Sequence, residues 1–166
     1  MTRIRLSTLI FCFALASASV GAAEQTLTFQ VVAHIKETKA LSVPGRAGHK
    51  VGIAAFHGLA IMENGEIAQH WYSGSFDFVD GAGRIHGYAQ WIFDDKSQLN
   101  AAYIGEAKAA PDGGITFKAA YSNVTGTGRF AGVRGEGSFA GRRFDPLKGG
   151  GDTYFRGTLA LTRAAK

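Results

Sequence analysis

The sequence predicts a single all-β domain, an eight-stranded antiparallel up-and-down barrel. Apolar and polar residues alternate with period two in about eight segments, which is the pattern of half-buried strands. Short polar turns separate most of these segments. Glycine is abundant, with 23 residues against 3 prolines, and no window carries the apolar stripe of a helix.

The predicted strands follow one another along the chain. The first covers residues 27–35, and the segment 115–121 alternates most clearly, with Ile115, Phe117 and Tyr121 on one face. The other strands are predicted at 51–62, 66–79, 84–94, 99–107, 133–139 and 154–162.

Turns and loops are predicted between these strands. Short hairpin turns are expected at 63–65, 80–83, 94–97 and 111–114, and longer loops at 36–50 and 142–152. An open meander of eight strands would expose two edges, whereas a barrel closes on itself. A two-sheet sandwich is the alternative.

The N-terminus has the three-part layout of a cleaved secretory signal, predicted to cover residues 1–23. Arg3 and Arg5 form the positive region, 6–18 is an apolar run too short to span a bilayer, and small residues follow at 20–23. We therefore expect a barrel domain at 24–166, periplasmic or secreted, without an integral membrane segment. An uncleaved anchor is the alternative.

Cleavage would change the composition of the protein. It removes the only cysteine, Cys12, and two of the 18 basic residues, so the net charge falls from +5 to +3. A disulfide is then impossible, and a packed core must stabilise the domain. The remaining basic residues are scattered and no recognition motif accompanies them, so we expect no binding to nucleic acid.

One segment carries a family resemblance. Residues 125–137 read T-G-T-G-R-F-A-G-V-R-G-E-G, which is similar to the G-G-T-G-R-F-x-G-x-x-G signature of the allene oxide cyclase and dirigent barrel superfamily. Thr125 departs from it by replacing the first glycine. Upstream positions are also arranged much as in bacterial secreted relatives: Asp77, Gly83 and Gly87-Tyr88.

The resemblance implies a fold and two classes of activity. The fold is a calycin-like or allene oxide cyclase-like barrel of eight strands with an apolar lumen, often assembled as a homotrimer. Members include cyclases of oxygenated fatty acids and proteins that steer phenoxyl radical coupling. Their catalytic residues cannot be aligned to this chain, so the catalytic residues remain unknown.

Other chemical motifs are weak. Residues 126–131 formally fit the G-x-G-x-x-A dinucleotide pattern, but that site requires a helix after the glycines, and a hairpin or bulge is favoured here. The histidines are too scattered to predict a metal site, and no G-x-S-x-G elbow is present. We therefore predict no cofactor and no metal.

Five side chains are candidates to bind a small hydrophobic or aromatic molecule in the lumen. His57 shares the apolar face of 51–61, where it would be a polar handle inside a pocket. Asp77 stands between two phenylalanines, either on the outer face, which is favoured, or in the lumen. The other candidates are rings that share faces with small residues: Trp91, Tyr103 and Tyr121. For His57 and the rings, simple core filling is the favoured interpretation, and ligand binding is the functional one.

Three functions remain open at this point. The first is a binding barrel that holds a small hydrophobic or aromatic ligand. The second is a cyclase, isomerase or dirigent-like coupling protein acting on such a molecule, which would need shape more than a sequence motif. The third is an interaction protein that uses its outer surface.

Overall fold

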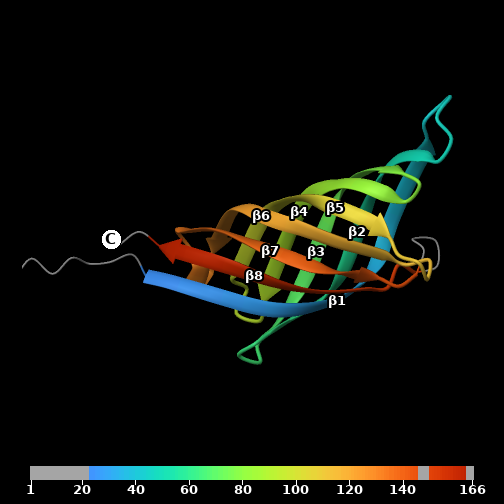
Figure 1. Ribbon diagram of the computed structural model, residues 1–166. Coiled ribbons are helices and arrows are strands. Elements are labelled where there is room, and N and C mark those ends of the chain that lie inside the picture. Colours follow the sequence, from blue (N-terminus) through green and yellow to red (C-terminus); the bar gives the residue numbers. More distant parts are fainter. Residues whose placement is uncertain (1–22, 146–149, 164–166) are drawn as a thin grey trace, which may run out of the picture.

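All eight predicted strands form, and they close into an antiparallel barrel in which each strand pairs with its neighbours in chain order. The computed structural model describes residues 23–145 and 150–163. Strand β8 pairs with β1, so the sheet closes on itself and a two-sheet sandwich is excluded. The elements are β1 (Ala23–Ser42), β2 (His49–Met62), β3 (Ile67–Val79), β4 (Ala82–Phe93), β5 (Gln98–Ala109), β6 (Ile115–Thr127), the 3-10 turn η1 (Gly128–Phe130), β7 (Val133–Arg143) and β8 (Thr153–Arg163) (Figure 1).

The prediction of a loop at 36–50 is wrong for most of these residues, which belong to strands. Strand β1 continues to Ser42 and β2 starts at His49, which leaves a short tip that projects beyond the barrel (Figure 1). A β-bulge between Ile35 and Glu37 shifts the register of this pair. Because a bulge moves the following side chains to the opposite face, the alternation breaks there and conceals the rest of the strand.

The four predicted short turns are confirmed, as is the hairpin at 125–137. Strand β6 ends at Thr127, η1 follows, and β7 returns from Val133. Gly128 has a φ of +60°, and a Cβ there would collide with Ser97, so this position requires glycine. A strand rather than an α-helix follows the glycines, which makes the dinucleotide pattern coincidental.

The two ends of the barrel differ. The end that carries the β2–β3, β4–β5 and β6–β7 turns is here called the closed end. The opposite end carries the β1–β2 tip and the β3–β4, β5–β6 and β7–β8 connections, and is here called the open end. Large, fully buried side chains fill the closed half, among them Phe29, Trp91, Leu99, Leu159 and Leu161.

A salt-bridged arginine covers the closed end. The rings of Phe93 and Phe130 meet there with centroids 5.0 Å apart. The Arg129 guanidinium lies over both rings, 4.6 Å and 4.8 Å from their centroids. Its Nη1 is 2.7 Å from a carboxylate oxygen of Glu66 and 3.7 Å from one of Asp95. This arrangement shields the aromatic core from water.

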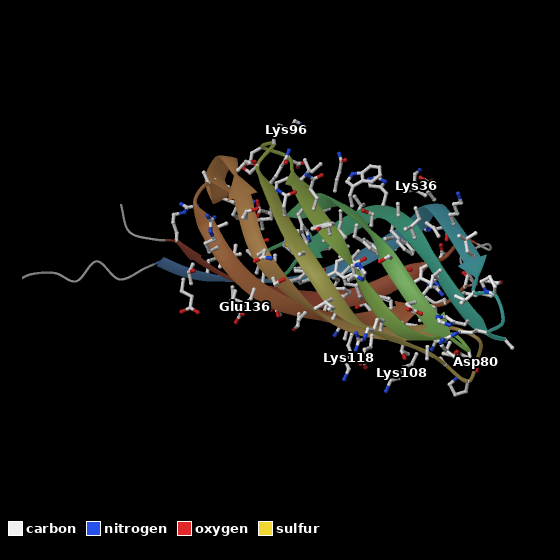
Figure 2. The ribbon with its side chains drawn as sticks, turned by 90° about the horizontal axis from the view of Figure 1, so that it is seen from above. Lys36, Asp80, Lys96, Lys108, Lys118 and Glu136 are labelled. Atoms are coloured by element: carbon white, nitrogen blue, oxygen red, sulfur yellow. The ribbon has the colours of Figure 1, made fainter. Side chains whose placement is uncertain are left out.

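Many charged side chains lie on the outside of the barrel. Figure 2 shows Lys36, Lys108, Lys118 and Glu136 pointing away from the strands, and all four are exposed. The predicted signal sequence lies outside the described residues except for Ala23, with which β1 begins.

Among the described residues, no helix has the length and apolar character needed to cross a membrane.

Candidate functional site

A cavity of about 80 Å³ occupies the open half of the lumen and is partly open to solvent. Aromatic side chains make up half of its lining, because inward positions on several strands carry rings. Small residues such as Ala54 and Gly74 leave the space between them. The aromatic lining residues are Phe56, Tyr72, Phe76, Phe78, Tyr103, Phe117, Phe139 and Phe155.

The aromatic walls are packed against one another. Phe56 and Tyr72 stack with centroids 4.6 Å apart and planes 6° from parallel. Tyr103 meets Phe139 edge-on at 5.6 Å. Stacked and edge-on pairs stabilise each other beyond simple burial. The positions of these rings are therefore fixed by contacts within the protein.

Two phenols contribute polar groups to the cavity. The Tyr72 ring is partly buried, and its buried hydroxyl makes no hydrogen bond of good geometry within the described residues, although the Thr153 side chain is close enough to oppose part of the pKa shift. The Tyr103 hydroxyl lies over Gly74, where a Cβ would collide with it, so glycine makes room for the phenol. Burial raises the pKa of both phenols above the ordinary value, which keeps them protonated at neutral pH.

Arg143, the last residue of β7, brings a positive charge to the cavity. Its Nε donates to the carbonyl oxygen of Asp145 at 3.1 Å. No carboxylate pairs with it among the described residues. Burial lowers the pKa of its guanidinium from the ordinary value, but an arginine still carries its charge at neutral pH. A half-buried cation without an acidic partner favours an anionic or electron-rich ligand.

A group of buried polar atoms without partners lies beneath the cavity. The ring of the fully buried His70 is centred 4.7 Å from the Trp91 ring and 5.4 Å from the Tyr72 ring. Within the described residues, neither nitrogen of His70 nor the indole nitrogen of Trp91 has a hydrogen-bond partner. Such groups cost about 1–3 kcal/mol each unless water or a ligand satisfies them.

Burial also controls the charge of His70. It lowers the pKa of His70 to about 3, and the Gln90 backbone opposes this shift without making a hydrogen bond of good geometry. The imidazole is therefore neutral at physiological pH.

Of the three aromatic candidates, only Tyr103 lines the cavity. Trp91 and Tyr121 are buried deeper, with centroids 5.3 Å apart, and Trp91 also meets Phe29 at 5.4 Å. Burial raises the pKa of Tyr121 well above its ordinary value. Both deeper rings fill the core, which is the interpretation that the sequence favoured for them.

His57 lies on the outer face, so both inward interpretations of it, as a core residue and as a polar group in a pocket, are wrong. Its neighbours across the strands are His34 and Trp71, and its ring stacks on that of Trp71 with centroids 3.9 Å apart. The inward residues of this part of β2 include Phe56 and Ala60. The larger aliphatic residues of 51–61 face outwards instead.

Asp77 also lies on the outer face, the position favoured for it. Its Oδ1 is 2.6 Å from His49 Nε2, and its side chain is exposed. The flanking Phe76 and Phe78 point into the cavity. Neither His57 nor Asp77 therefore lines the cavity.

Sequence reasoning missed Tyr72 and Arg143 as lining residues. Tyr72 has the same inward parity as Phe76 and Phe78, and that alternation could have identified it. Arg143 gave no comparable signal, because it belongs to the part of β7 that extends beyond the predicted strand.

The cavity is poorly suited to acid–base chemistry. No carboxylate is among the described residues that line it, and its phenols stay protonated at neutral pH. A general acid or base works best with a pKa near the operating pH. Within the described part of the chain, no group of three or more His, Cys, Asp or Glu could hold a metal ion. The arrangement can bind and orient a molecule.

Comparison with known proteins supports the fold. The structure is similar to the pterocarpan synthase dirigent protein GePTS1, with a TM-score of 0.50 and 12% identity, covering 95% of this chain and 100% of that chain. The fold is a dirigent-like barrel. At this identity the similarity concerns the fold alone. No family model and no curated protein matches the sequence.

Proposed function

We propose that this dirigent-like barrel binds a small aromatic molecule bearing a hydroxyl or carboxylate group in the open half of its lumen. The observation that carries the proposal is the aromatic-lined cavity whose lining includes the Arg143 guanidinium, which pairs with no carboxylate of the described residues. A ligand ring would pack against the walls formed by Phe56 and Phe139. Its polar group would meet Arg143 or the buried Tyr72 hydroxyl.

The size of the cavity favours a ligand with one ring. A dry cavity of roughly 150 Å³ accommodates benzene. The cavity here has a volume of about 80 Å³, about half of that, so more than one ring would not fit without movement of the walls. A single ring therefore enters with its polar end near the opening, or with a shift of Phe76 and Phe78. A long-chain lipid would require much larger movement of the packed rings.

A second candidate function is coupling or cyclisation of such a molecule. It is supported by the fold shared with a pterocarpan synthase dirigent protein. A reaction controlled by the relative orientation of reacting groups requires shape more than proton transfer. A cavity whose lining includes no carboxylate among the described residues is compatible with that kind of catalysis.

We also propose that the protein works outside the cytoplasm as a homotrimer. The three-part N-terminal sequence supports export. An exposed apolar patch on β1, β2 and β3 supports self-association, and the family resemblance favours a trimer. The patch consists of Val32, Leu59, Ile61 and Ile67, each 45–50% exposed.

Native mass spectrometry of the protein purified from its exported fraction tests these points together. We expect a trimer of chains that lack about the first 23 residues, with an additional small-molecule mass. An uncleaved chain would contradict the predicted processing, and a monomer would contradict self-association. A barrel that stays empty after a screen of phenolic compounds would refute the lumen proposal.

A matched pair of probes tests the role of Arg143. We expect Arg143→Gln to weaken binding of 4-hydroxybenzoate roughly tenfold or more, because a charge-assisted hydrogen bond is lost. Binding of the neutral 4-hydroxybenzyl alcohol should change little. The control Arg134→Gln removes an exposed outer arginine and should affect neither probe. Equal binding of 4-hydroxybenzoate by the wild type and Arg143→Gln would contradict the proposal, whereas turnover of either probe would favour the second function.

A further inference from the structure

A second depression lies on the outer face of the barrel, away from the lumen. It has a volume of about 610 Å³ and crosses β3, β4, β5 and the bulged part of β6. Pockets that take small molecules have volumes of roughly 300–1,000 Å³. The volume of the outer groove is therefore large enough for a small-molecule ligand.

Two exposed aromatic side chains line this groove. Trp71 is 39% exposed and Tyr88 is 73% exposed, although both are residue types that proteins usually bury in large part. They come from adjacent, paired strands: Trp71 is opposite Gln90, and Tyr88 is opposite Ser73. His57 stacks against Trp71 at 3.9 Å and supports its orientation. The groove thus offers the exposed Tyr88 ring and the part of the Trp71 ring that His57 leaves uncovered.

The polar side chains of the groove are neutral amides and hydroxyls. Gln90 Nε2 donates to Asn100 Oδ1 at 3.1 Å and to Gln98 Oε1 at 3.2 Å, which fixes the orientation of these amides. Among the described residues, Gln90 Oε1 and Asn100 Nδ2 make no further side-chain hydrogen bond, so they remain as a neighbouring acceptor and donor. This pairing matches the adjacent hydroxyl groups of a sugar, each of which both donates and accepts.

A backbone irregularity adds a third amide at the same place. The register of β6 shifts against both neighbouring strands, between Asn100 and Ala102 on β5 and between Tyr121 and Val124 on β6. Asn123 in this bulge has a φ of +53° and is exposed. Bulges redirect side chains at binding sites. Asn123 is one of the residues that line the groove, as is Asn100.

None of the described residues that line the groove is charged. Exposed lysines and carboxylates are common elsewhere on the barrel, so their absence from the groove selects against ionic ligands. We propose that the outer groove binds a neutral saccharide. The apolar C–H face of the sugar ring would pack on Trp71 or Tyr88, and its hydroxyls would bond to the amides of Gln90, Asn100 and Asn123.

Nuclear magnetic resonance of the full-length mature protein tests this directly. The chain has two tryptophans; Trp71 lies in the groove, and Trp91 is fully buried and serves as an internal reference. Titration with cellotriose and with maltotriose should shift the Trp71 indole resonance saturably for at least one of these neutral oligosaccharides. The Trp91 resonance should stay unchanged.

Variants locate the sugar on the outer face. Tyr88→Ala should weaken binding roughly tenfold, as expected for the loss of an aromatic contact. Asn123→Gly keeps the positive φ but removes the amide, and should weaken binding roughly two- to tenfold. The control Ile104→Ala removes an exposed outer side chain that does not line the groove and should leave affinity unchanged.

Three results would overturn the proposal. The first is the absence of any saturable Trp71 shift with either oligosaccharide at millimolar concentration. The second is competition between the sugar and 4-hydroxybenzoate, which would place both in the lumen. The third is a Trp71 shift on dilution of the sugar-free protein, which would mean that a second copy of the chain covers the groove.

Discussion

The closed half of the barrel is filled with side chains, whereas the open half keeps a cavity, although the same eight strands line both. In the closed half, Phe29 and Trp91 interlock and Arg129 covers the end. In the open half, small residues such as Gly74 stand between the aromatic walls. In a narrow barrel, inward side-chain size therefore decides between core and pocket, while strand arrangement stays the same.

The largest expected loss of stability comes from removing a buried ring from the closed half, compared with removing a ring from the open half. Phe29→Ala should lower the free energy of unfolding by about 3–5 kcal/mol, because the fully buried ring leaves a void. The matched variant Phe78→Ala removes a partly exposed cavity ring and should cost about 1 kcal/mol. Urea unfolding measures both values. Equal losses would show that the open half is packed as tightly as the closed half.

An intermediate effect is expected from His70, where the two halves meet. The pKa of His70 falls from 6.5 to about 3 on folding. Between these values the unfolded chain binds a proton that the native protein does not, so stability falls as pH falls below 6.5. The loss from pH 7 to pH 5 should be roughly 2 kcal/mol.

Removal of the imidazole tests this assignment. His70→Leu should flatten the pH dependence of the free energy of unfolding measured between pH 7 and pH 5. The control His86→Leu removes an exposed ring on the outer face and should leave the slope in place. A steep slope that survives in His70→Leu would show that other groups cause the acid sensitivity.

The smallest effect is expected at the arginine that covers the closed end. Arg129→Met should cost about 1 kcal/mol, since exposed ion pairs and cation–π contacts are each worth less than that. The hydrogen bond from Arg129 lowers the pKa of Glu66 from its ordinary 4.5. This stabilisation is present above pH 4.5 and is lost as pH falls through the lowered value.

The pH dependence distinguishes the ion pair from the contact with the rings. The stability difference between the wild type and Arg129→Met should shrink below pH 4.5 as Glu66 becomes protonated. Thermal unfolding at several pH values measures it, with Arg134→Met as the surface control. A difference that stays constant with pH would assign the whole effect to packing on Phe93 and Phe130.

The strands and short turns could be predicted because their signals are local. Alternation identified each strand, and glycine with polar residues marked each turn. The inward face of β2 could not be identified in this way, since both faces carry apolar residues. Pairing fixes it: Ala33 of β1 faces the lumen and is opposite Gly58, which places His57 outside.

The candidate site was only partly predictable. The alternation places Tyr103 on one face with small residues, and Tyr103 lines the cavity. Trp91 showed the same local pattern but is buried in the closed half. Arg143 reaches the cavity only because β7 extends beyond the segment whose alternation predicted it. Local patterns thus identify inward residues without giving their depth along the barrel.

The amino-acid sequence by itself determined the all-β class, the order of the eight strands and the positions of the tight turns. These depend on contacts and conformations of residues close together in the chain. Only the tertiary structure decided which side chains face the lumen after each bulge, where packing leaves a cavity, and that Trp71 and Tyr88 share an outer groove. Those features depend on the register between strands that are far apart in sequence.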